Sequence, residues 1–147
     1  MFRGVTRLTL DNKGRLAIPS KSRDVLVAQA GGRLLATAES RACILLYPEP
    51  EWLVIEERVN SLPSTNPQVG ALQDLLIGNA RELELDSAGR ILVPSELREF
   101  VGLTKDVALV GRGKKFALWD SEKWKARMDE AIALYQGGLG PQFDIPL

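Results

Sequence analysis

Apolar and polar side chains alternate at the start of the chain with the period of a half-buried β-strand. Over residues 5–10, apolar positions are separated by Arg7 and Thr9. Residues 11–14 then form a polar turn, because Asp and Asn can bond their own backbone and Gly can adopt a positive φ. Residues 15–18 return to an extended pattern. The segment therefore predicts a β-hairpin.

The rest of the first half predicts a short helix, two strands and a longer helix. Pro19 ends the first strand pattern and places Ser20 near the N-cap of the short helix. The longer helix carries Trp52, Ile55 and Val59 at helical spacing, which suits a face packed on a sheet. The predicted ranges are 20–26 for the short helix, 33–38 and 42–47 for the strands, and 51–61 for the longer helix.

Residues 61–67 are polar with two prolines and form the one clear linker. A helix near residues 68–77 follows, although residues 61–80 also fit one long helical connection. The second half then repeats the order of elements, and its last helix has Asp120 or Ser121 as its N-cap. The predicted ranges are 82–93 for a hairpin, 95–101 for a short helix, and 106–111 and 114–119 for strands. The last helix carries Trp124, Met128, Ile132 and Tyr135 on one face.

The two halves also repeat each other residue by residue. Residues 8–20 and 83–95 share Asp, Gly, Arg, Pro and Ser at an offset of 75 residues, and Arg23 matches Arg98. Tyr47 and Trp52 match Trp119 and Trp124 at an offset of 72. A repeat of this length indicates a duplicated module. We therefore predict a first module with its helix over 1–60, a linker and connecting helix over 61–80, a second module over 81–136, and a tail over 137–147, poorly ordered or docked on a neighbour.

The formal net charge is zero, but the charges are unevenly distributed. Residues 1–25 contain six basic and two acidic side chains, a balance of +4, and the remainder of the chain carries −4. A neutral total is unusual for a nucleic-acid binder, yet a concentrated basic edge can still attract phosphate. Copies of that edge in an oligomer would multiply a weak attraction.

Composition excludes several other classes of protein. The chain has no histidine and only one cysteine, Cys43, so we expect no disulfide, no catalytic triad, no metal site and no cofactor. No hydrophobic run reaches about 18 residues, the length that spans a membrane. The start of the chain leads directly into a strand pattern rather than a signal peptide. We expect a cytoplasmic protein without catalytic residues.

The sharpest motif is Asp-x-x-x-Arg, present as Asp11 with Arg15 and as Asp86 with Arg90. One interpretation is structural: Asp caps the turn amides, and Arg pairs with it or covers apolar surface. The other is nucleic-acid recognition, since a guanidinium at a hairpin end can bond guanine O6 and N7 or a phosphate. Recurrence of the motif within a longer matched context favours a functional role.

With these motifs in this order, the chain resembles the MraZ family, whose members contain two tandem AbrB/SpoVT-type swapped-hairpin modules. The resemblance covers nearly the whole chain, from residues 1–4 to the helix over 120–135. It implies an α+β fold with pseudo-two-fold symmetry and flanking helices. It also implies a nucleoid-associated repressor that binds double-stranded DNA at tandem repeats upstream of the division and cell-wall gene cluster. The family assembles as a cyclic homo-oligomer, so we expect an octamer-type ring.

The resemblance assigns DNA binding to the motif positions. We expect Arg15, Arg90, Lys13 and Arg3 to contact DNA, supported by Asp11, Gly14, Asp86 and Gly89. The first module is favoured for phosphate contact, because Ala88 replaces Lys13 in the second turn, and Glu82, Glu84, Glu96 and Glu99 flank that turn.

Other basic and aromatic residues have plainer interpretations. We expect Lys21 and Arg23 to lie on a solvated helix face, and residues 112–115 to form a solvated hairpin. The matched aromatic residues suit the core or a subunit interface better than base stacking. The alternative function is an antitoxin-like or ring-shaped scaffold that binds a protein instead of DNA.

Overall fold

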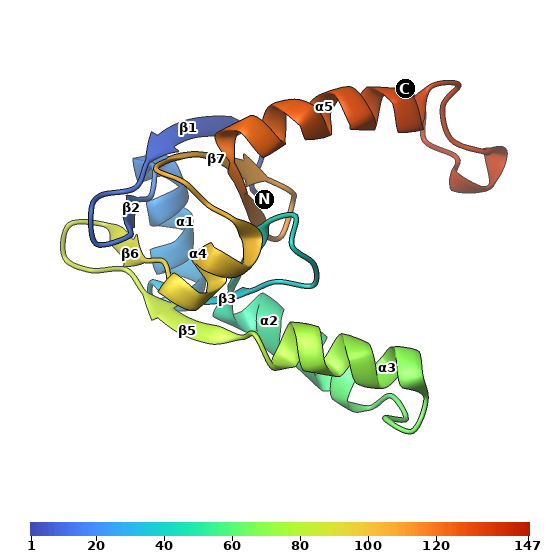
Figure 1. Ribbon diagram of the computed structural model, residues 1–147, viewed down its shortest axis with the longest axis horizontal. Helices are drawn as coiled ribbons and strands as arrows, with labels where there is room; N and C mark the ends of the chain where they lie inside the picture. The colour runs from blue at the N-terminus through green and yellow to red at the C-terminus, as the bar shows by residue number, and fades with distance from the viewer.

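The computed structural model describes all residues from 1 to 147, which form a six-stranded antiparallel sheet, a separate two-stranded ribbon and five α-helices (Figure 1). The strands are β1 (Val5–Thr9), β2 (Arg15–Ala17), β3 (Arg33–Thr37), β4 (Ile44–Pro48), β5 (Arg81–Glu84), β6 (Arg90–Leu92), β7 (Asp106–Gly111) and β8 (Phe116–Asp120). The α-helices are α1 (Ser20–Ala30), α2 (Glu49–Asn60), α3 (Pro67–Leu72), α4 (Ser95–Val101) and α5 (Ser121–Tyr135). This α+β architecture agrees with the predicted fold class.

The two halves of the chain exchange strands. The order in the large sheet is β1-β7-β8-β4-β3-β5, so β1 of the first half pairs with β7 of the second, and β5 pairs with β3. β2 pairs with β6 in the ribbon rather than with β1. The prediction of paired hairpins over 5–18 and 82–93 is therefore wrong. Pairing across the halves gives β1, β2, β5 and β6 partners that their own turns do not supply, and this leaves fewer open edges.

The strand pairing has pseudo-two-fold symmetry. In the ribbon, Leu16 lies opposite Ile91, and these two residues are equivalent in the repeat. At the centre of the sheet, Leu45 lies opposite Ala117, which is also its repeat equivalent. A pair of equivalent residues that face each other must lie on the axis that relates the halves. The axis therefore passes through both the ribbon and the middle of the sheet.

The sheet separates two hydrophobic cores, and its strands supply alternate residues to each. One core lies between the sheet, the β2–β6 ribbon, α1 and α4, and it contains Leu16, Ile91 and Leu46. The other lies on the opposite face and contains Leu45 and Trp52. Successive residues of β4 thus point to opposite faces, as the strand period requires. The ribbon is fixed to the sheet by its buried side.

The structure corrects the predicted end of the first helix and defines the connection between the modules. α1 continues to Ala30 rather than residue 26, and the residue before it, Pro19, occupies the N-cap without a side-chain bond from Ser20. A loop over 61–66 precedes a helix, which decides between the two alternatives for the connection. Asn66 caps this helix by accepting hydrogen bonds from two backbone N–H groups, and α3 continues into the π-helix η1 (Gln73–Ile77).

α5 and the tail extend away from the sheet (Figure 1). Asp120 caps α5 through a hydrogen bond from the backbone N–H of Lys123, as expected for a helix starting at Ser121. Apolar side chains of the predicted face, Met128, Ile132 and Tyr135, are exposed. The tail contains only a short 3₁₀-helix, η2 (Pro141–Phe143), and its residues are almost all exposed.

Candidate nucleic-acid interface

The first Asp-x-x-x-Arg turn is held by a local set of hydrogen bonds. Oδ1 of Asp11 accepts the backbone N–H groups of Lys13 at 2.9 Å and of Arg15 at 2.8 Å. Oδ2 of Asp11 accepts Nε of Arg15 at 2.7 Å. The backbone N–H of Gly14 donates to the Asp11 carbonyl at 3.0 Å, and Gly14 has a φ of +87°. One carboxylate therefore fixes the turn backbone and the arginine side chain together.

The second turn repeats this geometry. Oδ1 of Asp86 accepts the N–H groups of Ala88 at 2.9 Å and of Arg90 at 2.8 Å, and Oδ2 accepts Nε of Arg90 at 3.0 Å. Both turns project from the same end of the molecule, at the left in Figure 1, where the β2–β6 ribbon joins them. The ribbon thus displays two equivalent arginines on one surface.

Both carboxyl groups are held in the charged form. The N–H of Arg15 is the main cause that lowers the pKa of Asp11 from 3.8 to about 2, with further lowering by the Arg15 guanidinium and the N–H of Lys13. Partial desolvation opposes this change. The pKa of Asp86 is lowered in the same way, chiefly by the N–H of Arg90. The ion pairs therefore persist throughout the neutral pH range.

Each arginine retains hydrogen-bond donors for a ligand. Only Nε of Arg15 and of Arg90 is bonded within the protein, and about a third of each side chain is exposed, 34% and 36% respectively. The two terminal nitrogens therefore remain available, and the Nε bond restricts the side-chain rotamer. A planar fork in a fixed orientation suits guanine O6 and N7 or two phosphate oxygens.

The other predicted contacts lie in different places. Lys13 is exposed within the first turn, beside the arginine. Arg3 is exposed at the opposite end of β1. It lies next to the β7–β8 turn, where the carbonyl of Gly4 accepts the N–H of Gly111. The structure therefore brings Lys13, but not Arg3, to the paired turns.

Arg23 differs from its predicted place on a solvated helix face. It is half-buried and lies over Gly89 of the second turn, whereas Lys21 is exposed as predicted. Arg98, its repeat equivalent, lies over Gly14 of the first turn. The sequence comparison matched these two arginines, but their contacts with the opposite turns depend on the exchange of strands between the halves.

Two of the matched aromatic residues are closed to base stacking because they are buried. Tyr47 and Trp52 are buried in the second core, as predicted, with ring centroids 5.7 Å apart. The hairpin over 112–115 is only partly solvated, in contrast to the prediction. Nζ of Lys115 lies 5.3 Å from the centroid of the Tyr47 ring and donates to the Tyr47 hydroxyl at 3.3 Å. Arg112 is exposed.

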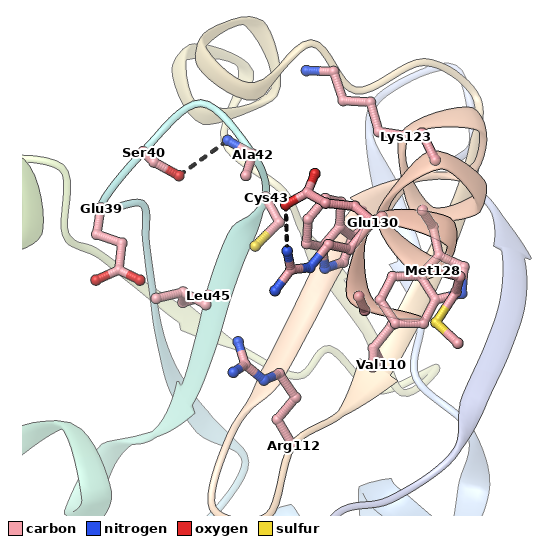
Figure 2. Close-up of a pocket in the computed structure, with 15 residues that line it drawn as sticks. Glu39, Ser40, Ala42, Cys43, Leu45, Val110, Arg112, Lys123, Met128 and Glu130 are labelled. Atoms are coloured by element: carbon pink, nitrogen blue, oxygen red, sulfur yellow. Dashed lines mark hydrogen bonds and ion pairs between the residues drawn. The ribbon is translucent and has the colours of Figure 1, made fainter. Parts of the chain in front are cut away.

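A concave surface lies beside α5, on the side of the β3–β4 loop (Figure 2). This open groove of about 650 Å³ is lined by Cys43, Trp124 and Met128, and Arg127 pairs with Glu130 at its margin. Burial raises the pKa of the Cys43 thiol to about 11, so the thiol is protonated at neutral pH. No residue of either Asp-x-x-x-Arg turn lines this groove.

No group of three or more His, Cys, Asp or Glu side chains could hold a metal ion. None of the helices is both long enough and apolar enough to cross a lipid bilayer.

The fold and the turns together define a class of protein: two interleaved β-modules that display a pair of Asp-x-x-x-Arg turns on one ribbon. Comparison with known proteins agrees with this description. A family model described as "MraZ protein, putative antitoxin-like" matches residues 1–75 and again residues 76–135. The chain belongs to the MraZ family of transcriptional regulators.

Similarity to individual relatives extends over nearly the full chain. A protein of Nitrosomonas europaea named "Transcriptional regulator MraZ" is 51% identical over 144 residues, covering 98% of this chain and 97% of the relative. Proteins of the same name from Nitrosospira multiformis and Klebsiella pneumoniae are 54% and 47% identical, over 93% and 95% of this chain and 93% of each relative.

Proposed function

We propose that this regulator is a sequence-specific, nucleoid-associated repressor that binds double-stranded DNA. Its target would be a set of tandem direct repeats upstream of the division and cell-wall gene cluster. The observation that carries the proposal is the pair of equivalent arginines, Arg15 and Arg90, displayed on one ribbon with free terminal nitrogens. The name shared by the relatives supports a role in transcription.

In this mechanism, Arg15 makes the principal base contact. Asp11 fixes its rotamer before DNA arrives, which reduces the entropy lost on binding. Lys13 adds a phosphate contact beside it. Arg90 makes the equivalent contact from the second module, where Ala88 supplies no cation. Arg3, at the other end of β1, would reach a more distant phosphate.

Avidity would follow from assembly into a cyclic homo-oligomer, with an octamer-type ring as the expected form. Exposed apolar side chains on α5, including Ile132 and Tyr135, provide surface for contact between subunits. Neighbouring subunits would then engage successive repeats, so that each additional repeat binds at a high effective concentration. The transcription machinery would then have no access to the bound DNA.

The test is fluorescence anisotropy on duplexes that carry one, two or four direct repeats, with a scrambled duplex as control, at two salt concentrations. Affinity should rise steeply with repeat number. Arg15→Ala should lose about 1–3 kcal/mol per contact, or roughly five- to 150-fold. Arg90→Ala should have a similar or smaller effect. Arg58→Ala removes an exposed charge from α2, outside the turns, and serves as the matched control.

Equal weak binding to every duplex, unaffected by Arg15→Ala, would refute the proposal. That outcome would instead favour the alternative function, an antitoxin-like or ring-shaped scaffold that binds an acidic protein. Sedimentation of each variant would show whether a loss of affinity reflects a lost contact or a changed subunit number.

A further inference from the structure

We propose that Arg98 and Arg23 are positioning residues, each of which holds the Asp-x-x-x-Arg turn of the opposite module in its binding geometry. This inference rests on the proposed DNA-binding function. Neither arginine belongs to the motif itself. Their roles are crossed, because the second half supplies the side chain for the first turn and the first half supplies the side chain for the second.

Arg98 of α4 closes one side of the first turn. A β-carbon built on Gly14 would lie 2.6 Å from Cζ of Arg98, so the guanidinium fills the space beside this glycine. Nε of Arg98 donates to the carbonyl of Val93 at 3.1 Å, and the N–H of Val93 donates to the carbonyl of Gly14 at 2.9 Å. These contacts connect α4 and the end of β6 to the turn that carries Arg15.

Arg23 of α1 takes the equivalent place in the second turn. A β-carbon on Gly89 would lie 2.9 Å from Cζ of Arg23, and the N–H of Ile18 donates to the carbonyl of Gly89 at 3.0 Å. One bond is missing from this copy. Nε of Arg23 is buried without a partner, although its equivalent in Arg98 is bonded. The Arg98 side chain is therefore anchored by one more hydrogen bond than the Arg23 side chain.

The contacts explain how a residue outside the motif can affect DNA binding. The hydrogen bonds within each turn fix its shape and tie it to the strand that carries its arginine, but they make no contact with the opposite module. The covering arginine and the bond from Val93 or Ile18 hold the turn against that module. A bidentate contact to a base tolerates only a small displacement, about 0.5 Å. Loss of the covering side chain should therefore weaken binding through the turn arginine.

A double-mutant cycle separates positioning from direct contact. DNA affinity is measured for full-length Arg98→Ala alone, with Arg15→Ala, and with Arg90→Ala. We expect Arg98→Ala to weaken binding about tenfold in the wild-type background and in the Arg90→Ala background, but less than about twofold in the Arg15→Ala background. Arg23→Ala should show the reverse dependence. Lys21→Ala, an exposed charge on α1, is the control.

Hydrogen–deuterium exchange provides a readout that does not require DNA. In Arg98→Ala, exchange should accelerate in a peptide over residues 8–15 and remain unchanged over residues 83–90. Arg23→Ala should give the opposite pattern. Arg98→Met and Arg23→Met, which keep an apolar stem, replace any alanine variant that does not fold.

The outcomes are distinct. Equal losses from Arg98→Ala with and without Arg15→Ala would mean that Arg98 contacts DNA directly, and would overturn the positioning role. Unchanged exchange in both peptides would overturn it as well. If Arg15→Ala alone binds DNA like the wild type, the proposed function fails, and the exchange experiment still decides whether Arg98 and Arg23 hold the turns.

Discussion

At the scale of single residues, one carboxylate in each Asp-x-x-x-Arg turn accepts hydrogen bonds from three donors. Oδ1 of Asp11 bonds two backbone N–H groups, and Oδ2 bonds the guanidinium of Arg15. This concentration of donors makes the turn a pH-dependent element, because protonation of the carboxyl group removes the negative charge that strengthens all three hydrogen bonds.

The pKa of Asp11 fixes the direction of this dependence. It falls from 3.8 to about 2 in the folded protein, so the carboxylate stabilises the fold above the unfolded value. That contribution should stay constant at neutral pH and disappear as the pH falls from about 4 to 2. A carbon-detected NMR titration of the Asp11 carboxyl group should give a midpoint near 2. A midpoint at or above 3.8 would contradict the observed hydrogen bonds. The control is Asp11→Asn, which has no titrating carboxyl group at this position.

Gly14 offers a second test at this scale. Gly14→Ala places a β-carbon at a φ of +87° and against the Arg98 guanidinium, whereas Gly4 has a φ of +86° and no atom within 4 Å of its β-carbon position. The backbone strain, about 1–3 kcal/mol, is common to both substitutions. Gly14→Ala should therefore lower the free energy of unfolding more than Gly4→Ala, as measured in urea. Equal losses would show that Arg98 moves aside at no cost.

At the scale of elements, the β2–β6 ribbon connects the turns to the core. It has only three residues in each strand, and one face of each strand is buried. Ile91 is fully buried opposite Leu16, whereas the adjacent Leu92 is 56% exposed. The ribbon is too short to be stable alone. Its position therefore depends on the side chains that it inserts beneath the sheet.

A pair of alanine substitutions tests this dependence. Ile91→Ala should lower the free energy of unfolding by about 2–5 kcal/mol, because it leaves a cavity on the axis between the halves. Leu92→Ala removes a similar volume from the exposed face and should cost less than about 1 kcal/mol. Chemical denaturation provides the measurement. Comparable losses would indicate that the ribbon does not anchor the turns.

The connection between the modules depends on a hydrogen bond that the sequence pattern does not reveal. Thr37, fully buried at the end of β3, donates through Oγ1 to the carbonyl of Leu76 in the π-helix at 2.6 Å. Thr37→Val should cost about 1–3 kcal/mol in the free energy of unfolding, because the carbonyl loses its partner without a change in side-chain shape. Thr37→Ser retains the hydroxyl and should recover part of this loss; no difference between the two variants would contradict this role.

At the scale of the whole molecule, the exchange of strands makes the two halves interdependent. The large sheet alternates between them at its ends, since β1 joins β7 and β3 joins β5. Each half alone would expose strand edges and would have only one of the two ribbon strands. We therefore expect the family matches at residues 1–75 and 76–135 to mark sequence repeats rather than independent folding units.

Separate fragments test this interdependence. Residues 1–75 and 76–147, prepared individually, should give no folded monomer by circular dichroism and sedimentation. An equimolar mixture should recover β-structure as a one-to-one complex, because each fragment supplies strands that the other lacks. A folded monomer from either fragment would contradict the account, and a mixture with an unrelated chain of similar length is the control.

The sequence by itself determined the repeat, the family, the α+β class, and the sites of most helices and strands. It also determined the turn geometry, because every bond from Asp11 or Asp86 lies within five residues of chain and depends on local residue types alone. The core role of Trp52 followed from helical spacing in the same way.

The local pattern left the pairing of strands open; the family resemblance implied an exchange between the halves, and the tertiary structure decided which strands pair. The alternating pattern of residues 5–18 satisfies a hairpin and an exchanged pairing equally, since both bury the same faces. The choice depends on contacts between residues about 75 or 100 positions apart, such as Leu16 with Ile91 and Val5 with Val110. The places of Arg23 and Arg98 over the opposite turns follow from that choice, so no local pattern could reveal them.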